Sequence, residues 1–206
     1  MSVGRRHGDP GYDTIAGLLE REPAARAEVS PFAAIAVILV PGETGRELLL
    51  IERAQREGDP WSGHMALPGG RLDPSDADLM SAAIREVSEE TGIRVEPAHL
   101  LGELDDVRPL KNPSAGGFAV RPFVFGLEAR PELALNHEVA SALWVPLLEL
   151  DARACDAEVE YRGNALTVPA YRCGPHTVWG LTHRVLCGFL ERLGKSFLAD
   201  QSSMKR

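Results

Sequence analysis

Residues 85–93 read Arg-Glu-Val-Ser-Glu-Glu-Thr-Gly-Ile. On a helix, Glu86, Glu89 and Glu90 are three or four residues apart, so their carboxylates lie on one stripe. Like charges at this spacing repel one another, and Arg85 alone cannot neutralise all of them. Carboxylate ligands with no His or Cys nearby are typical of Mg²⁺ or Mn²⁺ rather than zinc. The stripe therefore predicts a divalent-metal site, with a solvated acidic face of the helix as the alternative.

A sharp turn and a helix start signal precede this stretch. In Pro68-Gly69-Gly70, the side-chain-free backbone of Gly69 and Gly70 can approach a metal or a phosphate closely. Apolar residues at helical spacing then predict an amphipathic helix over residues 76–91. Its apolar stripe consists of Met80, Ile84, Val87 and Thr91. Ser75 or Asp76 is expected to cap the start of this helix, and Gly92 is placed for a left-handed end.

The rest of the chain alternates strand and helix patterns. Short β-branched or aliphatic runs predict strands at 33–40, 47–53, 99–107, 118–127, 142–145, 159–161 and 166–171. Helical periodicity predicts helices at 12–22 and 178–193. This interleaving over one continuous stretch favours a single α/β domain. We expect an N-terminal extension with a short helix at 1–30, the domain at 31–194 and a flexible tail at 195–206.

Composition narrows the class of protein. The chain has 206 residues, of which 44% are hydrophobic and 25% charged, which is typical of a globular protein. Its net charge of −8 argues against binding to nucleic acid. No apolar run is long enough to span a membrane, and no targeting segment is visible. Three cysteines without CxxC spacing fit neither a disulfide framework nor a cysteine zinc site, so we expect a cytoplasmic protein.

Residues 68–93 resemble the Nudix box, in which Gly, five residues, Glu and seven residues precede Arg-Glu-aliphatic-x-Glu-Glu-x-Gly-aliphatic. Residues 85–93 match every fixed position of the second half. In the first half the Glu position falls on Asp76, and one extra residue separates it from Arg85. Because of this departure, we expect Asp76 to cap the helix rather than act in catalysis.

The resemblance implies a Nudix-type α/β/α sandwich with a mixed sheet, and hydrolysis of a diphosphate by water with the help of Mg²⁺ or Mn²⁺. It implies that Glu86 and Glu90 are metal ligands, and that Glu89 bridges the metals or helps to deprotonate water. Arg85 would orient a neighbouring glutamate. The expected partner is a small-molecule diphosphate, with neither nucleic acid nor membrane, and a homodimer remains open.

Within this family, residues 67–76 are similar to the coenzyme A pyrophosphatase subgroup, as are residues 49–54 and Gly63 upstream. The subgroup similarity implies coenzyme A or an acyl-CoA as substrate. The second arginine of the upstream signature is missing, and its position falls on Asp59. That absence favours an alternative, a Nudix pyrophosphatase for nucleotide sugars or dinucleoside polyphosphates. A non-catalytic Nudix-fold ligand sensor is a third possibility, but it would be expected to lose the box carboxylates.

Three more residues are candidates for the site. Glu138 precedes the predicted strand at 142–145 and is a candidate general base or further metal ligand, with an exposed strand-edge glutamate as the alternative. Arg53 and Arg71 flank the glycine turn and could hold phosphate oxygens, with surface ion pairs as the alternative. The polar segment 111–117 is a candidate substrate-recognition loop.

Overall fold

The computed structural model describes residues 11–59, 61–108, 118–161 and 163–203. A seven-stranded mixed sheet forms its centre, with the strand order β3-β2-β1-β6-β5, β4 paired to β1, and β7 paired to β2. These strands are β1 (Pro31–Pro41), β2 (Arg46–Arg53), β3 (Met65–Ala66), β4 (Gly69–Arg71), β5 (Leu100–Glu103), β6 (Ala119–Gly126) and β7 (Val139–Pro146). Strands β1 and β6 run parallel, and the other pairs are antiparallel.

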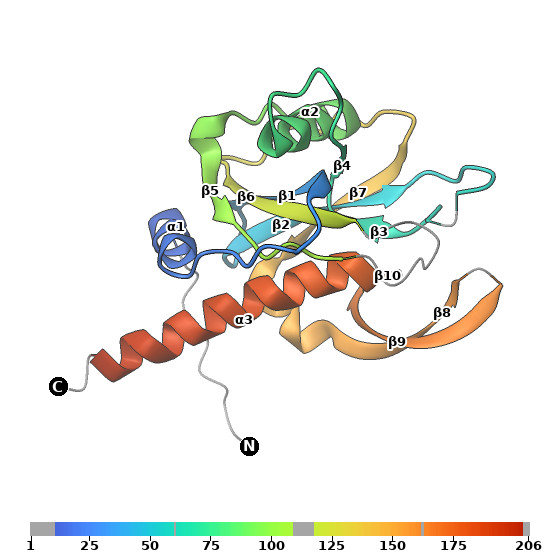
Figure 1. Cartoon of the computed structure of the whole chain (residues 1–206). Coiled ribbons are helices and arrows are strands. Elements are labelled where there is room, and N and C mark those ends of the chain that lie inside the picture. The colour runs from blue at the N-terminus through green and yellow to red at the C-terminus, as the bar shows by residue number, and fades with distance from the viewer. Residues whose placement is uncertain (1–10, 60, 109–117, 162, 204–206) are drawn as a thin grey trace.

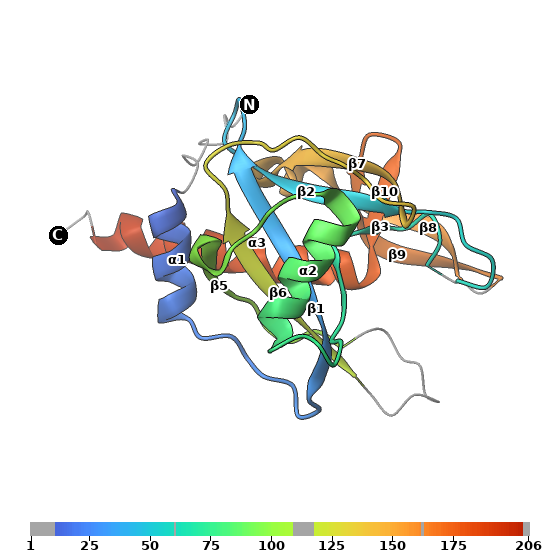
Figure 2. The same cartoon turned by 90° about the horizontal axis from the view of Figure 1, so that it is seen from above.

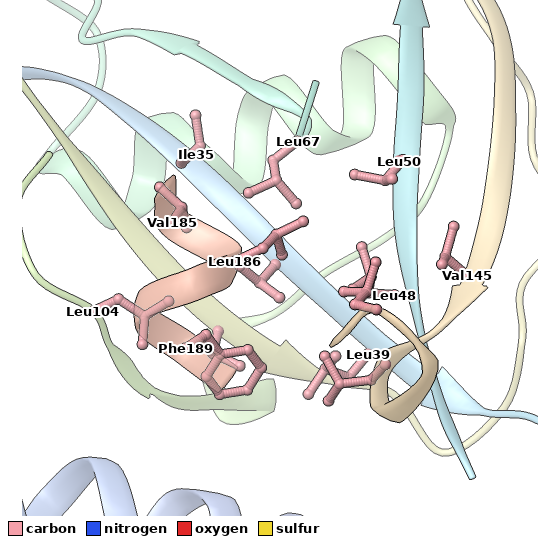
Figure 3. Packing of buried hydrophobic residues seen from close by; sticks show 14 of the residues in the cluster. Ile35, Leu39, Leu48, Leu50, Leu67, Leu104, Val145, Val185, Leu186 and Phe189 are labelled. Carbon is pink, nitrogen blue, oxygen red and sulfur yellow. The ribbon is translucent and has the colours of Figure 1, made fainter. Parts of the chain in front are cut away.

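Strand β1 is buried on both faces, which explains its unbroken apolar sequence. Ala34 and Ile38 pack into the core on the side of α2 (Leu79–Thr91), whereas Val37 and Leu39 pack into the core on the opposite side. Helices α1 (Tyr12–Arg21) and α3 (Gly180–Ser203) contribute to that opposite core (Figures 1, 2 and 3). The predicted α/β/α sandwich with a mixed sheet in a single domain is confirmed.

The N-terminal helix belongs to this core. Ile15, Leu18 and Leu19 of α1 are buried in it. The Tyr12 hydroxyl donates to the carbonyl oxygens of Leu39 at 3.1 Å and Leu127 at 2.6 Å. The extension predicted at 1–30 therefore includes a helix that is packed onto the main sheet.

A second, three-stranded antiparallel sheet comprises β8 (Ala154–Tyr161), β9 (Asn164–Cys173) and β10 (His176–Trp179). The predicted helix start at Val178 is wrong, because Val178 and Trp179 pair with β9 and are buried there. Helix α3 instead begins at Gly180, which has a φ of 66°. Short 3₁₀ helices lie at Pro97–His99, Leu147–Glu149 and Asp151–Arg153.

The remaining expectations concern the C-terminal segment, the cysteines, a membrane span and the candidate recognition loop. Helix α3 continues to Ser203, so the segment predicted as a flexible tail at 195–206 is helical over residues 195–203, and its flexibility stays a prediction. Cys155, Cys173 and Cys187 are free thiols. No helix in the described part of the chain is long and apolar enough to cross a membrane. The candidate recognition loop at 111–117 lies outside the described residues.

Candidate active site

Helix α2 presents the predicted carboxylates, and its two ends are capped. At the start, Asp78 Oδ1 accepts a hydrogen bond from the Ser81 backbone N–H at 2.7 Å. The prediction that Ser75 or Asp76 caps the helix is therefore wrong. At the end, Gly92 adopts the predicted left-handed conformation with a φ of 72°. Caps at both ends satisfy backbone groups that the helix itself leaves unpaired.

The Asp78 cap leads to a prediction about stability. Replacing Asp78 with Ala should lower the free energy of unfolding by about 1 kcal/mol, because the Ser81 N–H loses its acceptor. Urea denaturation measures this change. Ser75→Ala is the matched control, because among the described residues the Ser75 hydroxyl bonds only to Asp73, in the loop before the helix. A larger loss for Ser75→Ala than for Asp78→Ala would contradict the assignment of the cap.

Glu90 is the buried member of the carboxylate stripe, with 3% of the residue exposed. One of its carboxylate oxygens accepts the Gly69 backbone N–H at 2.9 Å. Burial raises the pKa of the Glu90 carboxyl to about 7, and the negative charges of Glu86 and Glu138 act in the same direction. The Gly69 hydrogen bond and the charge of Arg53 oppose this rise. A buried carboxylate among like charges is a favourable ligand for a cation.

The glycine turn can lie close to these carboxylates because Gly69 and Gly70 have no side chains. Gly69 has a φ of 147°, and a Cβ there would lie 2.3 Å from the Ala34 carbonyl oxygen in β1. A Cβ at residue 70 would lie 2.2 Å from Glu86 Oε1. Position 69 therefore requires glycine, because its φ is positive and its neighbour is the backbone of β1, whereas a side chain at residue 70 would displace the Glu86 carboxylate.

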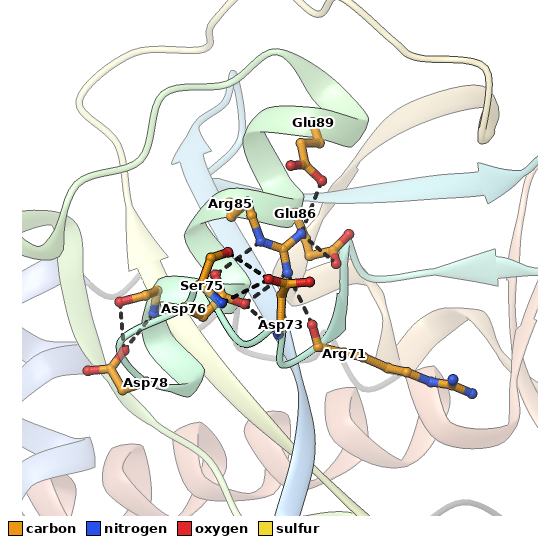
Figure 4. Close-up of polar contacts among 9 residues, drawn as sticks. Arg71, Asp73, Ser75, Asp76, Asp78, Arg85, Glu86 and Glu89 are labelled. Atoms are coloured by element: carbon orange, nitrogen blue, oxygen red, sulfur yellow. Dashed lines mark hydrogen bonds and ion pairs between the residues drawn. The ribbon is translucent and has the colours of Figure 1, made fainter.

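Arg85 forms the largest polar network of the site (Figure 4). Its Nε and Nη2 each donate to Asp76 at 3.0 Å, which is a bidentate ion pair. Its Nη1 donates to Glu86 at 2.9 Å and to Glu89 at 3.1 Å. Arg85 therefore holds two of the predicted ligands on one side while Asp76 anchors it on the other.

The anchoring role of Asp76 was missed by sequence reasoning. Its side chain is only 5% exposed and lies under the Arg85 guanidinium. A usable signal was present, because Asp76 occupies the acidic position of the first half of the box. Asp76 lies in the loop between β4 and α2, and it contacts Arg85 within the helix. Helical periodicity does not predict a contact between a loop and a helix.

A second polar group lies near Glu90, at the end of β2 and in the loop that follows it. Arg53 Nη2 pairs with Asp59 at 2.9 Å, and Arg56 Nη2 pairs with Glu138 at 2.9 Å. The Ala54 N–H also donates to the Glu138 carbonyl oxygen at 2.8 Å, which joins this loop to the start of β7. Asp59, which stands where the subgroup signature has an arginine, is thus the ion-pair partner of Arg53.

The predicted site residues are mostly brought together. Gly69 and Gly70 adjoin the glutamates of α2, and both Arg53 and Glu138 are close enough to Glu90 to influence its titration. Arg71 differs, because only its carbonyl oxygen takes part, accepting Arg85 Nη2 at 3.1 Å. Its guanidinium points away from the carboxylates (Figure 4) and lies over the Phe32 ring.

The donor set fits a hard divalent cation by its chemistry. Glu86, Glu89 and Glu90 offer only carboxylate oxygens, and Glu90 is buried among like charges. Within the described ranges no three His, Cys, Asp or Glu side chains are already grouped around one point. Arg85 instead bonds Glu86 and Glu89, so binding of a cation would compete with this guanidinium. The assignment of these glutamates as ligands stays a prediction.

Comparisons with known proteins agree with this architecture. The family described as NUDIX domain matches residues 31–163. Human mitochondrial coenzyme A diphosphatase NUDT8 is 32% identical over 167 residues, which cover 77% of this chain and 69% of that protein. An uncharacterized Schizosaccharomyces pombe protein is 42% identical over 119 residues, which cover 55% of this chain and only 36% of that protein.

A solved structure shows the same fold. The MutT/nudix family protein from Enterococcus faecalis superposes with a TM-score of 0.57 at 14% identity, covering 90% of this chain and 70% of that one. The likeness extends over nearly the whole chain, including residues beyond the range matched by the family description.

Proposed function

This chain belongs to the NUDIX family, and from that premise we propose that it hydrolyses the diphosphate bond of coenzyme A or an acyl-CoA with the help of Mg²⁺ or Mn²⁺. The observation that carries the proposal is the arrangement of Glu86, Glu89 and Glu90 around Arg85 and the glycine turn. The 32% identity to the human coenzyme A diphosphatase, over 77% of this chain, supports the choice of substrate.

The reaction assigns a separate task to each group of residues. Glu86, Glu89 and Glu90 would hold the cations, and Asp76 and Arg85 would position two of these glutamates. When bound, Mg²⁺ or Mn²⁺ supplies neutralisation of the diphosphate charge and acidifies the attacking water. Glu89, whose side chain is 55% exposed, or Glu138 near Glu90 would accept the proton of that water.

Positively charged side chains near the site must offset the charge of the protein, because a net charge of −8 opposes the approach of an anionic substrate. Arg53 is suited to this task, since it lies close to Glu90 and its Nε is buried with no hydrogen-bond partner in the described residues. Its pairing with Asp59 limits the positive charge that it offers. The backbone of Gly69 and Gly70 would line the same side of the diphosphate.

The presence of Asp59 favours one alternative substrate class. An acid in place of the signature arginine weakens the expected recognition of coenzyme A and keeps nucleotide sugars or dinucleoside polyphosphates as the second candidate. A non-catalytic ligand sensor is less well supported, because all three box glutamates are present. Glu86 and Glu89 accept from Arg85, and Glu90 accepts the Gly69 N–H.

A substrate panel tests the proposal. Coenzyme A is expected to be hydrolysed with a kcat/KM about tenfold or more above that for ADP-ribose and diadenosine polyphosphates, because a site built for its polar groups discriminates against analogues that lack them. The products, adenosine 3′,5′-bisphosphate and 4′-phosphopantetheine, are measured by chromatography. A Glu90→Gln preparation made in the same way controls for contaminating activity.

A higher kcat/KM for ADP-ribose or diadenosine polyphosphates than for coenzyme A would contradict the proposed substrate and favour the second candidate class. Binding of these compounds with no turnover of any of them would favour the ligand sensor.

A further inference from the structure

The Arg71 side chain leaves the carboxylate site although its backbone is fixed there. Residue 71 directly follows Gly70, and its carbonyl oxygen accepts a hydrogen bond from Arg85. The guanidinium carbon of Arg71 instead lies 5.6 Å from the centre of the Phe32 ring. The positive charge is therefore displaced from the glutamates by the length of one side chain, toward the beginning of β1.

The ring under this guanidinium belongs to a small group of apolar side chains at the surface. Phe32 is 36% exposed and Leu72 is 42% exposed. The rings of Phe32 and Phe118 meet edge to face with centroids 4.5 Å apart. The Leu72 N–H donates to the Phe32 carbonyl oxygen at 2.8 Å, so the backbone on both sides is held in place. We refer to Phe32, Arg71, Leu72 and Phe118 together as the Phe32 patch.

Arg71 also differs from the neighbouring arginines in its charge balance. Arg53 is paired with Asp59, Arg56 with Glu138, and Arg85 with three acids. Among the residues that the structure describes, Arg71 has no acidic partner. On a chain of net charge −8, an exposed and unpaired guanidinium against an aromatic ring is a site for an anion attached to a planar or apolar group.

We propose that the Phe32 patch binds the nucleoside 3′-phosphate end of the substrate, with the base against Phe32 and the 3′-phosphate on Arg71. This inference rests on the proposed function, which places the diphosphate at the glutamates of α2. In coenzyme A the 3′-phosphate is one ribose away from that diphosphate, and the Arg71 guanidinium lies over Phe32 while the backbone of Gly70, next to it in the chain, approaches Glu86. The pantetheine arm then leaves on the other side, toward Arg53 and Glu138.

Binding of product fragments tests the patch without requiring catalysis. Calorimetry in excess EDTA should show that the parent protein binds adenosine 3′,5′-bisphosphate roughly tenfold or more tightly than adenosine 5′-monophosphate. Arg71→Gln should remove this preference, because it removes the charge that faces the 3′-phosphate. Phe32→Leu should weaken both ligands by a similar factor of about fivefold or more, because it removes the stacking surface but not the charge.

Arg21→Gln is the matched control, because it removes one exposed arginine from α1, on the opposite side of the sheet from α2. It should bind both ligands like the parent protein. Melting temperatures of the variants, compared with the parent, exclude loss of fold as the cause of weakened binding. An undiminished 3′-phosphate preference in Arg71→Gln, or unchanged binding in Phe32→Leu, overturns the assignment of the patch.

Hydrolysis separates this inference from the proposed function. If coenzyme A is hydrolysed and its KM is unchanged by Arg71→Gln and Phe32→Leu, the reaction stands and the patch assignment fails. If coenzyme A is not hydrolysed but the binding pattern above is found, the patch assignment stands and the proposed reaction fails.

Discussion

Glu90→Gln is expected to lower kcat by about 10²-fold or more, because it removes a charged oxygen ligand while preserving the size of the side chain. The amide oxygen can still accept the Gly69 N–H that the carboxylate accepts at 2.9 Å. Glu90 is buried beside Glu86 and Glu138, so the loss of one negative charge reduces repulsion among them. The variant should therefore fold normally.

Steady-state kinetics with coenzyme A at saturating Mg²⁺ measures the loss, and a thermal melt verifies the fold. The matched control is Glu20→Gln, which neutralises an exposed glutamate on α1, across the sheet from α2. It should leave kcat within about twofold of the parent value. A Glu90→Gln enzyme with near-normal kcat would show that Glu90 is not a ligand.

Removal of divalent cations should have an even larger effect. With excess EDTA, turnover is expected to fall by about 10³-fold or more, and Mg²⁺ or Mn²⁺ should restore it. The physical reason is the charge of the site. Arg85 is shared among Asp76, Glu86 and Glu89, so its single positive charge cannot also neutralise a diphosphate.

The measurement is a titration of EDTA against activity, followed by addition of each metal in excess. Zn²⁺ serves as the comparison, because the site offers carboxylate oxygens, and no His or Cys of the described residues is bonded to its glutamates. Undiminished turnover in excess EDTA would rule out the metal-dependent mechanism, whatever the substrate.

The end of α2 and its start show where sequence reasoning succeeds and where it fails. Gly92 was predicted correctly, because a left-handed helix end strongly favours glycine and that preference is local. The start was placed at Ser75 or Asp76, whereas Asp78 caps the helix. Ser, Asp and Asn are all good N-caps, so a run that contains several of them does not specify which one is used.

The prediction of where α3 begins was wrong for a related reason. Val178 fits the apolar spacing of the helix, yet it pairs with Tyr171 across β9 and β10. A short apolar segment has the same local pattern in a strand and in a helix. Pairing with a strand that lies elsewhere in the chain decides between them, and the positive φ of Gly180 then separates the two elements.

The sequence by itself determined the helical stripe of Glu86, Glu89 and Glu90 and the glycine turn before it, because periodicity and backbone freedom depend on neighbouring residues. The sandwich fold was implied by the resemblance of residues 68–93 to the Nudix box. Only the tertiary structure decided that Glu90 is buried while Glu89 is exposed, and that Asp76 anchors Arg85.

It also decided that Arg53 faces an acid while Arg71 lies over an exposed ring. Arg53 and Arg71 flank the same turn and are chemically alike, so no local pattern distinguishes them. What separates them is the set of side chains that other strands and loops bring within reach. Burial and charge pairing are properties of that packing, and they leave Arg53 paired with Asp59 and Arg71 without an acidic partner among the described residues.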